Sequence, residues 1–165
     1  DYKQAVKWFR LAAEQGDADA PNNLGSMYLY GKGVPQDYKE AFKWYRLAAE
    51  QGDAKAQYIV GVMYFNGEGV PQNDNLAVKW YRLAAEQGDA MAQHNLGTMY
   101  LYGKGVLKDW IYAYAWYNVA QANGNEEAKK CRDELELTPE LLVLRGQAQA
   151  LSTEIYKRIE ANRKD

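Results

Sequence analysis

Hydrophobic and charged residues alternate with a helical period over the first 15 residues of the chain. Apolar positions three and four residues apart are occupied by Ala5, Trp8, Phe9, Ala12 and Ala13. Because side chains at these spacings share one face of an α-helix, the pattern predicts a helix over residues 1–15. The opposite face carries Lys7, Arg10 and Glu14, and opposite charges four residues apart stabilise a helix. We interpret this charged face as solvent-exposed and convex.

A second helix is predicted directly after Gly16 and Asp17. Gly16 offers the left-handed conformation that ends a helix, and Asp17 offers a side-chain oxygen that caps the next one. Pro21 lacks a backbone donor, but near the first turn it should only shift the helix start by about one residue. Gly25 is small enough for the close approach of a neighbouring helix. The buried stripe expected for this helix consists of Ala20, Leu24, Met27 and Tyr28.

A glycine-rich segment, residues 31–35 (GKGVP), follows this helix. Phosphate-binding loops also use glycines, but they need the spacing Gly-x-x-x-x-Gly-Lys-Ser/Thr after a strand, and neither condition holds here. We therefore predict a tight interhelical loop in which Val34 contacts the core. Asp37 and Glu40 then form a capping box for the following helix.

The whole pattern repeats with a period of 36 residues. About 24 positions are identical between residues 1–36 and 37–72, beyond what a shared helical composition gives. A single unit of this kind cannot bury its apolar face alone, so the units are expected to stack. The sequence therefore predicts an all-α fold, a solenoid of antiparallel helix-turn-helix repeats. Packing between units explains a constant phase of large side chains, so we expect the core to contain the four tryptophans, Trp8, Trp44, Trp80 and Trp116.

The predicted units form a single domain overall. They are a half repeat over 1–16, full repeats over 17–52, 53–88 and 89–124, a decayed half repeat over 125–137, and a C-terminal capping helix over 138–165. In the decayed half repeat, Arg132 and Asp133 replace the Leu-Gly pair of earlier units. An amphipathic helix after it can cover the terminal apolar face of the array. The stripe of this last helix is Leu141, Leu144, Ala148, Leu151, Ile155 and Ile159.

Net charge and rare residue types narrow the classes of function. The 20 Lys and Arg against 22 Asp and Glu give a formal net charge of -2, so no basic field neutralises nucleic-acid phosphates. No apolar run approaches the about 18 residues that a membrane span needs. One cysteine, Cys131, and one histidine, His94, exclude an internal disulfide and a Cys/His metal cluster. We expect no cofactor, no metal, no nucleic-acid partner and no membrane insertion.

The chain opens at Asp1 inside a repeat. We expect a further segment upstream of Asp1, and any targeting signal would lie there. The compartment therefore does not follow from these residues.

Three motifs carry a resemblance to a known family. They are residues 96–100 (LGTMY), 67–71 (GEGVP) and 41–49 (AFKWYRLAA). With the 36-residue period, they make the chain resemble the Sel1-like repeat family from Asp1 to about Asn125. The segment 109–136 resembles the closing repeat of such arrays. Departures are Val60, where a leucine is usual, and Leu107, where a proline is usual.

The resemblance implies a right-handed superhelix related to the tetratricopeptide repeats. It also implies an adaptor that binds a protein or peptide, and it favours a bacterial protein that acts in the periplasm or after secretion. A cysteine-rich bacterial branch of the family has been credited with binding or hydrolysing β-lactams. That branch pairs cysteines within its repeats, whereas Cys131 has no second cysteine to pair with.

Candidate partner-binding residues lie on the first helix of each unit, which by the resemblance lines the concave side. Their identities vary between units that otherwise agree closely. An asparagine can donate to and accept from a peptide backbone, and a tyrosine supplies anchoring area, so an extended peptide fits. The alternative is drift at unconstrained surface positions. The candidates are Asn22, Asn23, Ser26, Tyr30, Tyr58, Ile59, Val62, Asn66, His94, Asn95, Thr98 and Tyr102.

The single histidine and the single cysteine each have a functional and a structural interpretation. His94 can contact a ligand or respond to pH, but a single exposed histidine on a helix more often does neither. We interpret Cys131 as a small, partly buried filler rather than a nucleophile, because no histidine lies near it in register to act as a base.

Three functions remain compatible with the sequence. The first is a non-catalytic scaffold or adaptor for a protein partner, favoured because no set of nucleophile, base and orienting group stands out. The second is an enzyme, a hydrolase of β-lactam or cell-wall type, which only analogy at the level of the fold supports. The third is a structural arm that self-associates end to end, which the start inside a repeat motivates.

Overall fold

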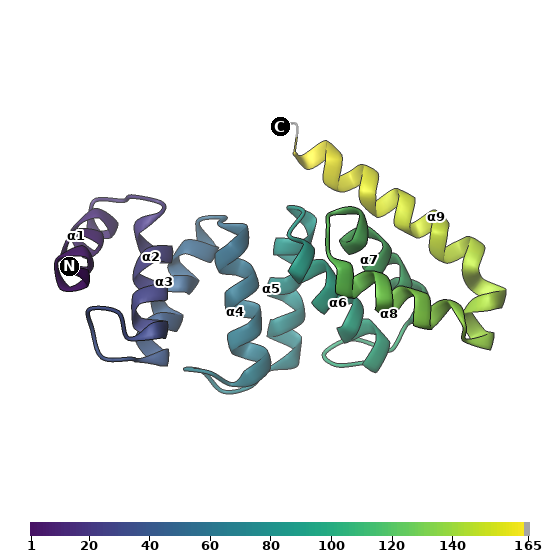
Figure 1. The fold of residues 1–165 in the computed structure, drawn as a ribbon, viewed down its shortest axis with the longest axis horizontal. Coiled ribbons are helices and arrows are strands. Elements are labelled where there is room, and N and C mark those ends of the chain that lie inside the picture. Colours follow the sequence, from purple (N-terminus) through teal and green to yellow (C-terminus); the bar gives the residue numbers. More distant parts are fainter. Residues whose placement is uncertain (164–165) are drawn as a thin grey trace. The chain divides into compact units, whose positions relative to one another are not determined.

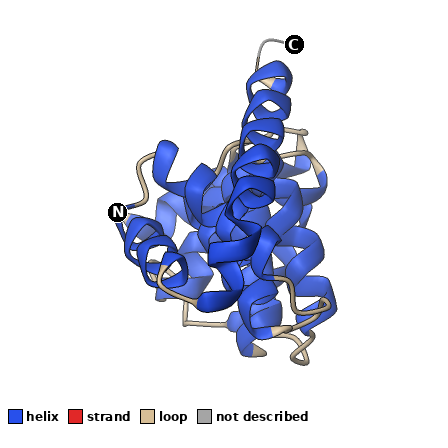
Figure 2. Ribbon diagram, turned by 90° about the vertical axis from the view of Figure 1, so that its right-hand side faces the viewer, coloured by secondary structure: helices blue, strands red, loops and turns tan. Residues whose placement is uncertain are grey.

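The computed structural model describes residues 1–163 of the chain, and these residues form nine helices and no strand (Figures 1 and 2). The helices come in the predicted helix-turn-helix order, which confirms the all-α solenoid. Their bounds are α1 (Tyr2–Glu14), α2 (Ala20–Tyr30), α3 (Tyr38–Glu50), α4 (Ala54–Asn66), α5 (Asp74–Glu86), α6 (Ala90–Tyr102), α7 (Trp110–Ala122), α8 (Glu126–Glu136) and α9 (Pro139–Asn162).

The helices belong to two compact units. The first unit, Asp1–Ala77, contains α1 to α4 and the start of α5. The second unit begins at Val78 and contains the rest of α5 together with α6 to α9. None of the helices between residues 1 and 163 is long and apolar enough to cross a membrane.

Aspartates and glycines mark the helix ends, as the sequence predicts. Asp53 caps α4 by accepting from the Ala56 N–H at 2.6 Å, and Asp89 caps α6 in the same way. Gly67, directly after α4, has a φ of 74°, in the left-handed region that a residue with a Cβ avoids. Asp37 caps α3, but the Glu40 carboxylate forms an ion pair with Lys43.

The start of α2 differs from the prediction. The N-cap position of α2 is Asp19 and not Asp17, although the Asp17 carboxylate accepts from the N–H groups of Asp19 and of Ala20, the first residue of the helix. In α4, by contrast, the N–H of Gln57 donates to Asp53 and continues the helix. Pro21 stands at that register in α2 and has no N–H to donate, so the helix begins later and Pro21 falls in its first turn.

Glycines let consecutive helices pack at short distance. A Cβ on Gly25 of α2 would lie 2.8 Å from the ring of Tyr45 on α3. A Cβ on Gly97 of α6 would lie 2.9 Å from the ring of Tyr117 on α7. Both tyrosines are buried. The same contact therefore joins α2 to α3 in the first unit and α6 to α7 in the second.

The prediction that all four tryptophans lie in the core is wrong for Trp8. Trp116 is only 3% exposed, and Trp44 is half-buried against a cluster that contains Val6 and Leu24. The side chain of Trp8 is 67% exposed. The reason is positional: Trp44 packs back toward α1, whereas the described residues contain no helix ahead of α1 for Trp8 to pack against.

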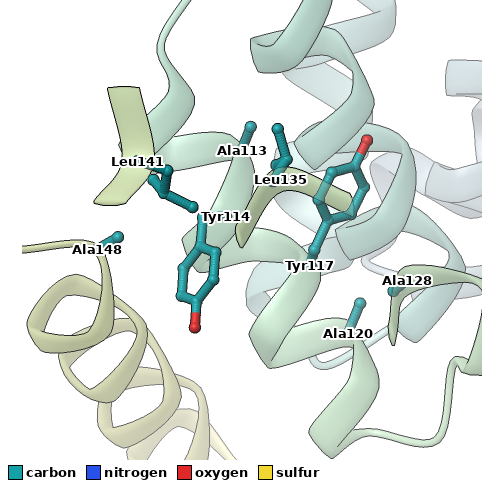
Figure 3. Packing of buried hydrophobic residues seen from close by; sticks show 8 residues of the cluster. All are labelled: Ala113, Tyr114, Tyr117, Ala120, Ala128, Leu135, Leu141 and Ala148. Atoms are coloured by element: carbon teal, nitrogen blue, oxygen red, sulfur yellow. The ribbon is translucent and has the colours of Figure 1, made fainter. Parts of the chain in front are cut away.

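Helix α9 packs on α7 in the second unit, as predicted for a cap (Figure 1). Figure 3 shows Leu141 and Ala148 of this helix on the same side of α7 as the ring of Tyr114. Leu135 of α8 completes the cluster. From the predicted stripe of α9, Leu144 and Leu151 are half-buried, and the buried members are Leu141, Ala148, Ile155 and Ile159.

Candidate protein-binding surface

The predicted partner-binding residues lie on α2 and α4 of the first unit and on α6 of the second. Each of these helices has a buried face made of the same residue types. In α2 it contains Ala20, Leu24 and Met27, and in α6 it contains Ala92, Leu96 and Met99. The candidates occupy the other positions of these helices. Because their identities differ between repeats whose buried residues agree, we call this set of candidates the variable face.

In the first unit the candidates range from exposed to half-buried. Tyr30, Asn23 and Asn66 are exposed. The ring of Tyr30 lies 5.6 Å from the ammonium nitrogen of Lys32, close enough for a cation–π contact. The half-buried candidates are Asn22, Ser26, Tyr58, Ile59 and Val62.

Several of these side chains also contact their own helix or its neighbour. The Asn23 amide donates to the carbonyl of Asp19 at 3.1 Å, and the Asn66 amide donates to the Glu68 carboxylate at 3.2 Å. Ser26 forms a hydrogen bond with the hydroxyl of Tyr45. Burial raises the pKa of Tyr45 to about 12, so this hydroxyl stays protonated.

In the second unit, Tyr102 is exposed, and His94, Asn95 and Thr98 are half-buried. The Thr98 hydroxyl lies 2.9 Å from the hydroxyl of Tyr117, at the register where Ser26 meets Tyr45. It also donates to the carbonyl of His94. Ser26 and Thr98 thus serve the packing of the repeat as well as its surface.

His94 and Cys131 lie side by side, which the sequence analysis missed. His94 is half-buried rather than exposed, and its Nε2 lies 3.9 Å from the Sγ of Cys131. The imidazole also contacts the ring of Tyr117, with 5.5 Å between ring centroids. Cys131 directly follows Lys130, which lies one 36-residue period after His94. The period could therefore have predicted this contact.

The environment favours the neutral form of both groups. Burial raises the pKa of the Cys131 thiol and lowers the pKa of the His94 imidazole. A catalytic thiolate needs the opposite shift of the cysteine, together with a cationic neighbour. The pair is therefore a packing contact between a thiol and a neutral ring.

A comparison with protein-family models matches the Sel1 repeat over four consecutive segments, residues 1–17, 18–53, 54–89 and 90–125. The chain belongs to the Sel1 repeat family. Beyond residue 125, the second unit continues with α8 and α9, outside the matched segments.

Solved structures of Sel1 repeat proteins have the same fold. The chain is 38% identical to c5321, a protective antigen present in uropathogenic Escherichia coli strains, with a TM-score of 0.77 over 98% of this chain. The match spans 34% of the antigen. A Sel1 repeat protein from Oxalobacter formigenes is 41% identical, with a TM-score of 0.72 over 78% of this chain and 97% of that one.

A more distant similarity covers 79% of this chain and 94% of the Helicobacter pylori cysteine rich protein B, with 23% identity and a TM-score of 0.62. At this identity the similarity concerns the fold alone. No curated protein matches the chain.

Buried polar side chains tie the Sel1 helices together, and these were also missed by sequence reasoning. The side chain of Gln93 donates to the carbonyl of Ala85 at 2.9 Å, and its oxygen accepts from Asn123 at 3.0 Å. Gln57, one period earlier, donates to the carbonyl of Ala49 at 3.2 Å. Recurrence of glutamine on an otherwise apolar face is the signal that could have identified them. Within residues 1–163, no group of three or more His, Cys, Asp and Glu side chains is placed to hold a metal ion.

Proposed function

We propose that this chain is a non-catalytic scaffold that binds a peptide or protein partner through the variable face of its first helices. The observation that carries the proposal is the combination of a constant buried face with exposed tyrosines and asparagines. Tyr30 on α2 and Tyr102 on α6 present exposed rings at equal positions of their repeats. Membership of the Sel1 family, commonly protein-interaction scaffolds, supports the same role.

The chemistry of this face suits an extended peptide. Asn22, Asn23 and Asn95 carry amides that can donate to a peptide carbonyl and accept from a peptide N–H. Tyrosine is enriched among the residues that carry most of the binding energy at interfaces, because it buries a large rigid ring at low entropic cost. Tyr30 and Tyr102 are therefore the anchors we expect to contribute most.

The hydrolase alternative has no observation in its favour. In the one contact that could suggest nucleophilic chemistry, between Cys131 and His94, burial favours the neutral form of each group. The similarity to the cysteine rich protein B is a similarity of fold. The single cysteine of this chain cannot form the disulfides of a cysteine-rich repeat.

Affinity capture from native lysate, followed by mass spectrometry and by titration of each purified partner, tests the proposal. The wild type is compared with a variant that carries Tyr30→Ala and Tyr102→Ala. The matched control carries Tyr38→Ala and Tyr156→Ala, two exposed tyrosines outside this face. We expect loss of the two anchors to raise the Kd by roughly tenfold or more, about 1.4 kcal/mol, while the control leaves it unchanged.

Partners that bind the variant and the wild type equally would exclude the variable face as the site. Turnover of nitrocefin or of a cell-wall substrate by the purified chain would exclude the non-catalytic role.

A further inference from the structure

In the first compact unit, α1 and α3 are each the second helix of a repeat. A hollow lies at equivalent positions on the outer face of both helices. On α1 it has a volume of about 200 Å³ and is lined by Val6, Lys7, Arg10, Leu11 and Glu14. On α3 it has a volume of about 420 Å³, and its lining includes the residues 36 positions further on, Phe42, Lys43, Arg46, Leu47 and Glu50. The hollow is therefore a property of the repeat and not of one helix.

On α7 of the second unit, the same register positions face α9. A hollow of about 340 Å³ is lined on one side by Asn118, Val119 and Ala122 of α7, and on the other by Ser152, Thr153 and Tyr156 of α9. Val119 stands at the register of Leu11 and Leu47. It is 1% exposed, whereas Leu11 is 44% and Leu47 is 37% exposed. An amphipathic helix thus covers this face on α7, whereas the face is open on α1 and α3.

The residues of α7 are adapted to that coverage. Ala115, Asn118 and Ala122 stand where α1 has Lys7, Arg10 and Glu14, so the charges are absent where α9 docks. Helix α9 contributes Ser152, Thr153 and Tyr156 to this hollow, and Ser152 is buried and small enough for close approach. Its apolar residues Leu151 and Ile155, four positions apart, line a neighbouring hollow together with Tyr112 and Trp116 of α7. The chain itself shows what kind of element fits this register.

Charged residues flank both open hollows. Helix α1 carries three basic residues and one acidic residue, and α3 carries three basic and two acidic residues. On α3, Glu40 and Glu50 pair with Lys43 and Arg46 within the helix. In the linings themselves, Lys7 and Arg10 outnumber Glu14 on α1, whereas Lys43 and Arg46 balance Glu40 and Glu50 on α3. A helix that docks here therefore meets exposed leucines, with an excess of positive charge on the α1 side.

We propose that the outer face of α1 and α3 docks an amphipathic helix of another protein. This helix carries apolar residues four positions apart, as Leu151 and Ile155 are in α9, and acidic residues on its flanks. The surface lies on the second helices of the repeats, apart from the first-helix face proposed above to bind a peptide. Failure of either proposal leaves the other standing.

The test uses the full chain and a synthetic peptide of residues 146–163 in which Lys157, Arg158 and Arg163 are replaced by glutamate. Fluorescence anisotropy of the labelled peptide measures its Kd for the wild type at low and high salt. A second peptide with the same charge carries Leu151→Asn and Ile155→Asn. We expect binding that weakens with salt, and at least a tenfold higher Kd for the second peptide.

Variants of the chain locate the peptide. Leu11→Glu and Leu47→Glu replace exposed leucines, and circular dichroism verifies that each variant keeps its fold. The matched control is Leu137→Glu, an exposed leucine outside the hollows. A Kd raised at least tenfold in both variants and unchanged in the control supports the proposal.

Absence of binding, or equal binding to the wild type and to both variants, overturns it. Sedimentation of the chain alone tests whether a second copy of the chain occupies this face instead. A concentration-dependent dimer that Leu47→Glu abolishes would assign this face to a second copy of the chain, and would overturn the proposal as well.

Discussion

Some side chains of this repeat array lie on the surface and also contact a neighbouring helix. Thr98 and Ser26 belong to the variable face, yet each hydroxyl meets a buried tyrosine of the next helix. Glycine acts by lacking a side chain, since Gly25 leaves the space that the ring of Tyr45 fills. The structure therefore makes sharp predictions for small changes at such positions.

Replacing Gly25 with alanine should destabilise the chain. Alanine favours a helix by up to about 1 kcal/mol over glycine, but its Cβ would lie 2.8 Å from the Tyr45 ring and force that buried ring to move. Overpacking of this kind typically costs about 1–3 kcal/mol, so we expect a net loss of stability. The control is Gly146→Ala in α9, where a Cβ meets nothing within 4 Å and should stabilise by about 0.5–1 kcal/mol. Urea denaturation of both variants measures the two effects; equal effects of the two substitutions would contradict the close packing at Gly25.

His94 should make the stability fall at acidic pH. Burial lowers its pKa in the folded chain below the value of about 6.5 in the unfolded chain. Above that value both states are neutral at this position. As the pH falls below it, the unfolded chain takes up the proton more readily, and stability is lost. Thermal melts at pH 7.5 and 5.5 should show a larger drop for the wild type than for His94→Gln. An identical drop in both proteins would show that His94 does not contribute.

At the scale of the helix, the sequence predicts most of what the structure contains. The Gly-Asp pairs predict where α4 and α6 begin, because a left-handed residue and a capping carboxylate are local devices. Contacts between helices are harder to predict. Trp8 was expected in the core because it shares the phase of the other tryptophans, and the contact of His94 with Cys131 was not predicted. Both depend on which helix lies alongside, and this is not encoded in the pattern of a single helix.

The cap of α8 shows how a helix end adapts to burial. Asn125 stands where α4 and α6 have aspartate, and it is buried. Its oxygen accepts from the Ala128 N–H at 2.8 Å, while its nitrogen donates to the carbonyl of Ala90 at 3.3 Å. Asparagine performs both roles, whereas aspartate has no donor to offer.

We therefore expect Asn125→Asp to destabilise the chain by about 1–3 kcal/mol, because it removes the hydrogen bond to the Ala90 carbonyl and buries a charge. The matched control is Asp53→Asn, a partly exposed cap with a single acceptor role, which should change stability by less than about 0.5 kcal/mol. Denaturant titrations of the two variants decide this. Equal losses would refute the dual role of Asn125.

On the scale of the whole molecule, we expect the stability of each helix to depend mainly on the helices that it contacts. In the first unit α1, α2, α3 and α4 each pack on the next, and in the second unit α7 packs on α6 and α8 while α9 packs on α7 and α8. In such a quasi-one-dimensional arrangement, a local perturbation reaches its neighbours first. The two compact units divide the chain inside α5.

Ile159→Ala should accordingly destabilise the second unit selectively. Ile159 is fully buried, so removing its side-chain atoms should cost about 2–4 kcal/mol. Hydrogen exchange followed by mass spectrometry should show lower protection in α7, α8 and α9, with α2 and α3 unchanged. A uniform loss across all helices would show that the chain unfolds as one cooperative unit.

The glycine–tyrosine contact also governs how such a gene can change length. Because α2–α3 and α6–α7 share the contact, a duplicated or deleted stretch of 36 codons carries both halves of the junction and restores it at each new boundary. Helix α8 breaks this rule, since it carries Arg132 and Asp133 at the Leu-Gly register. Recombination can therefore add or remove repeats ahead of α7, and each event alters the variable face by one complete set of residues.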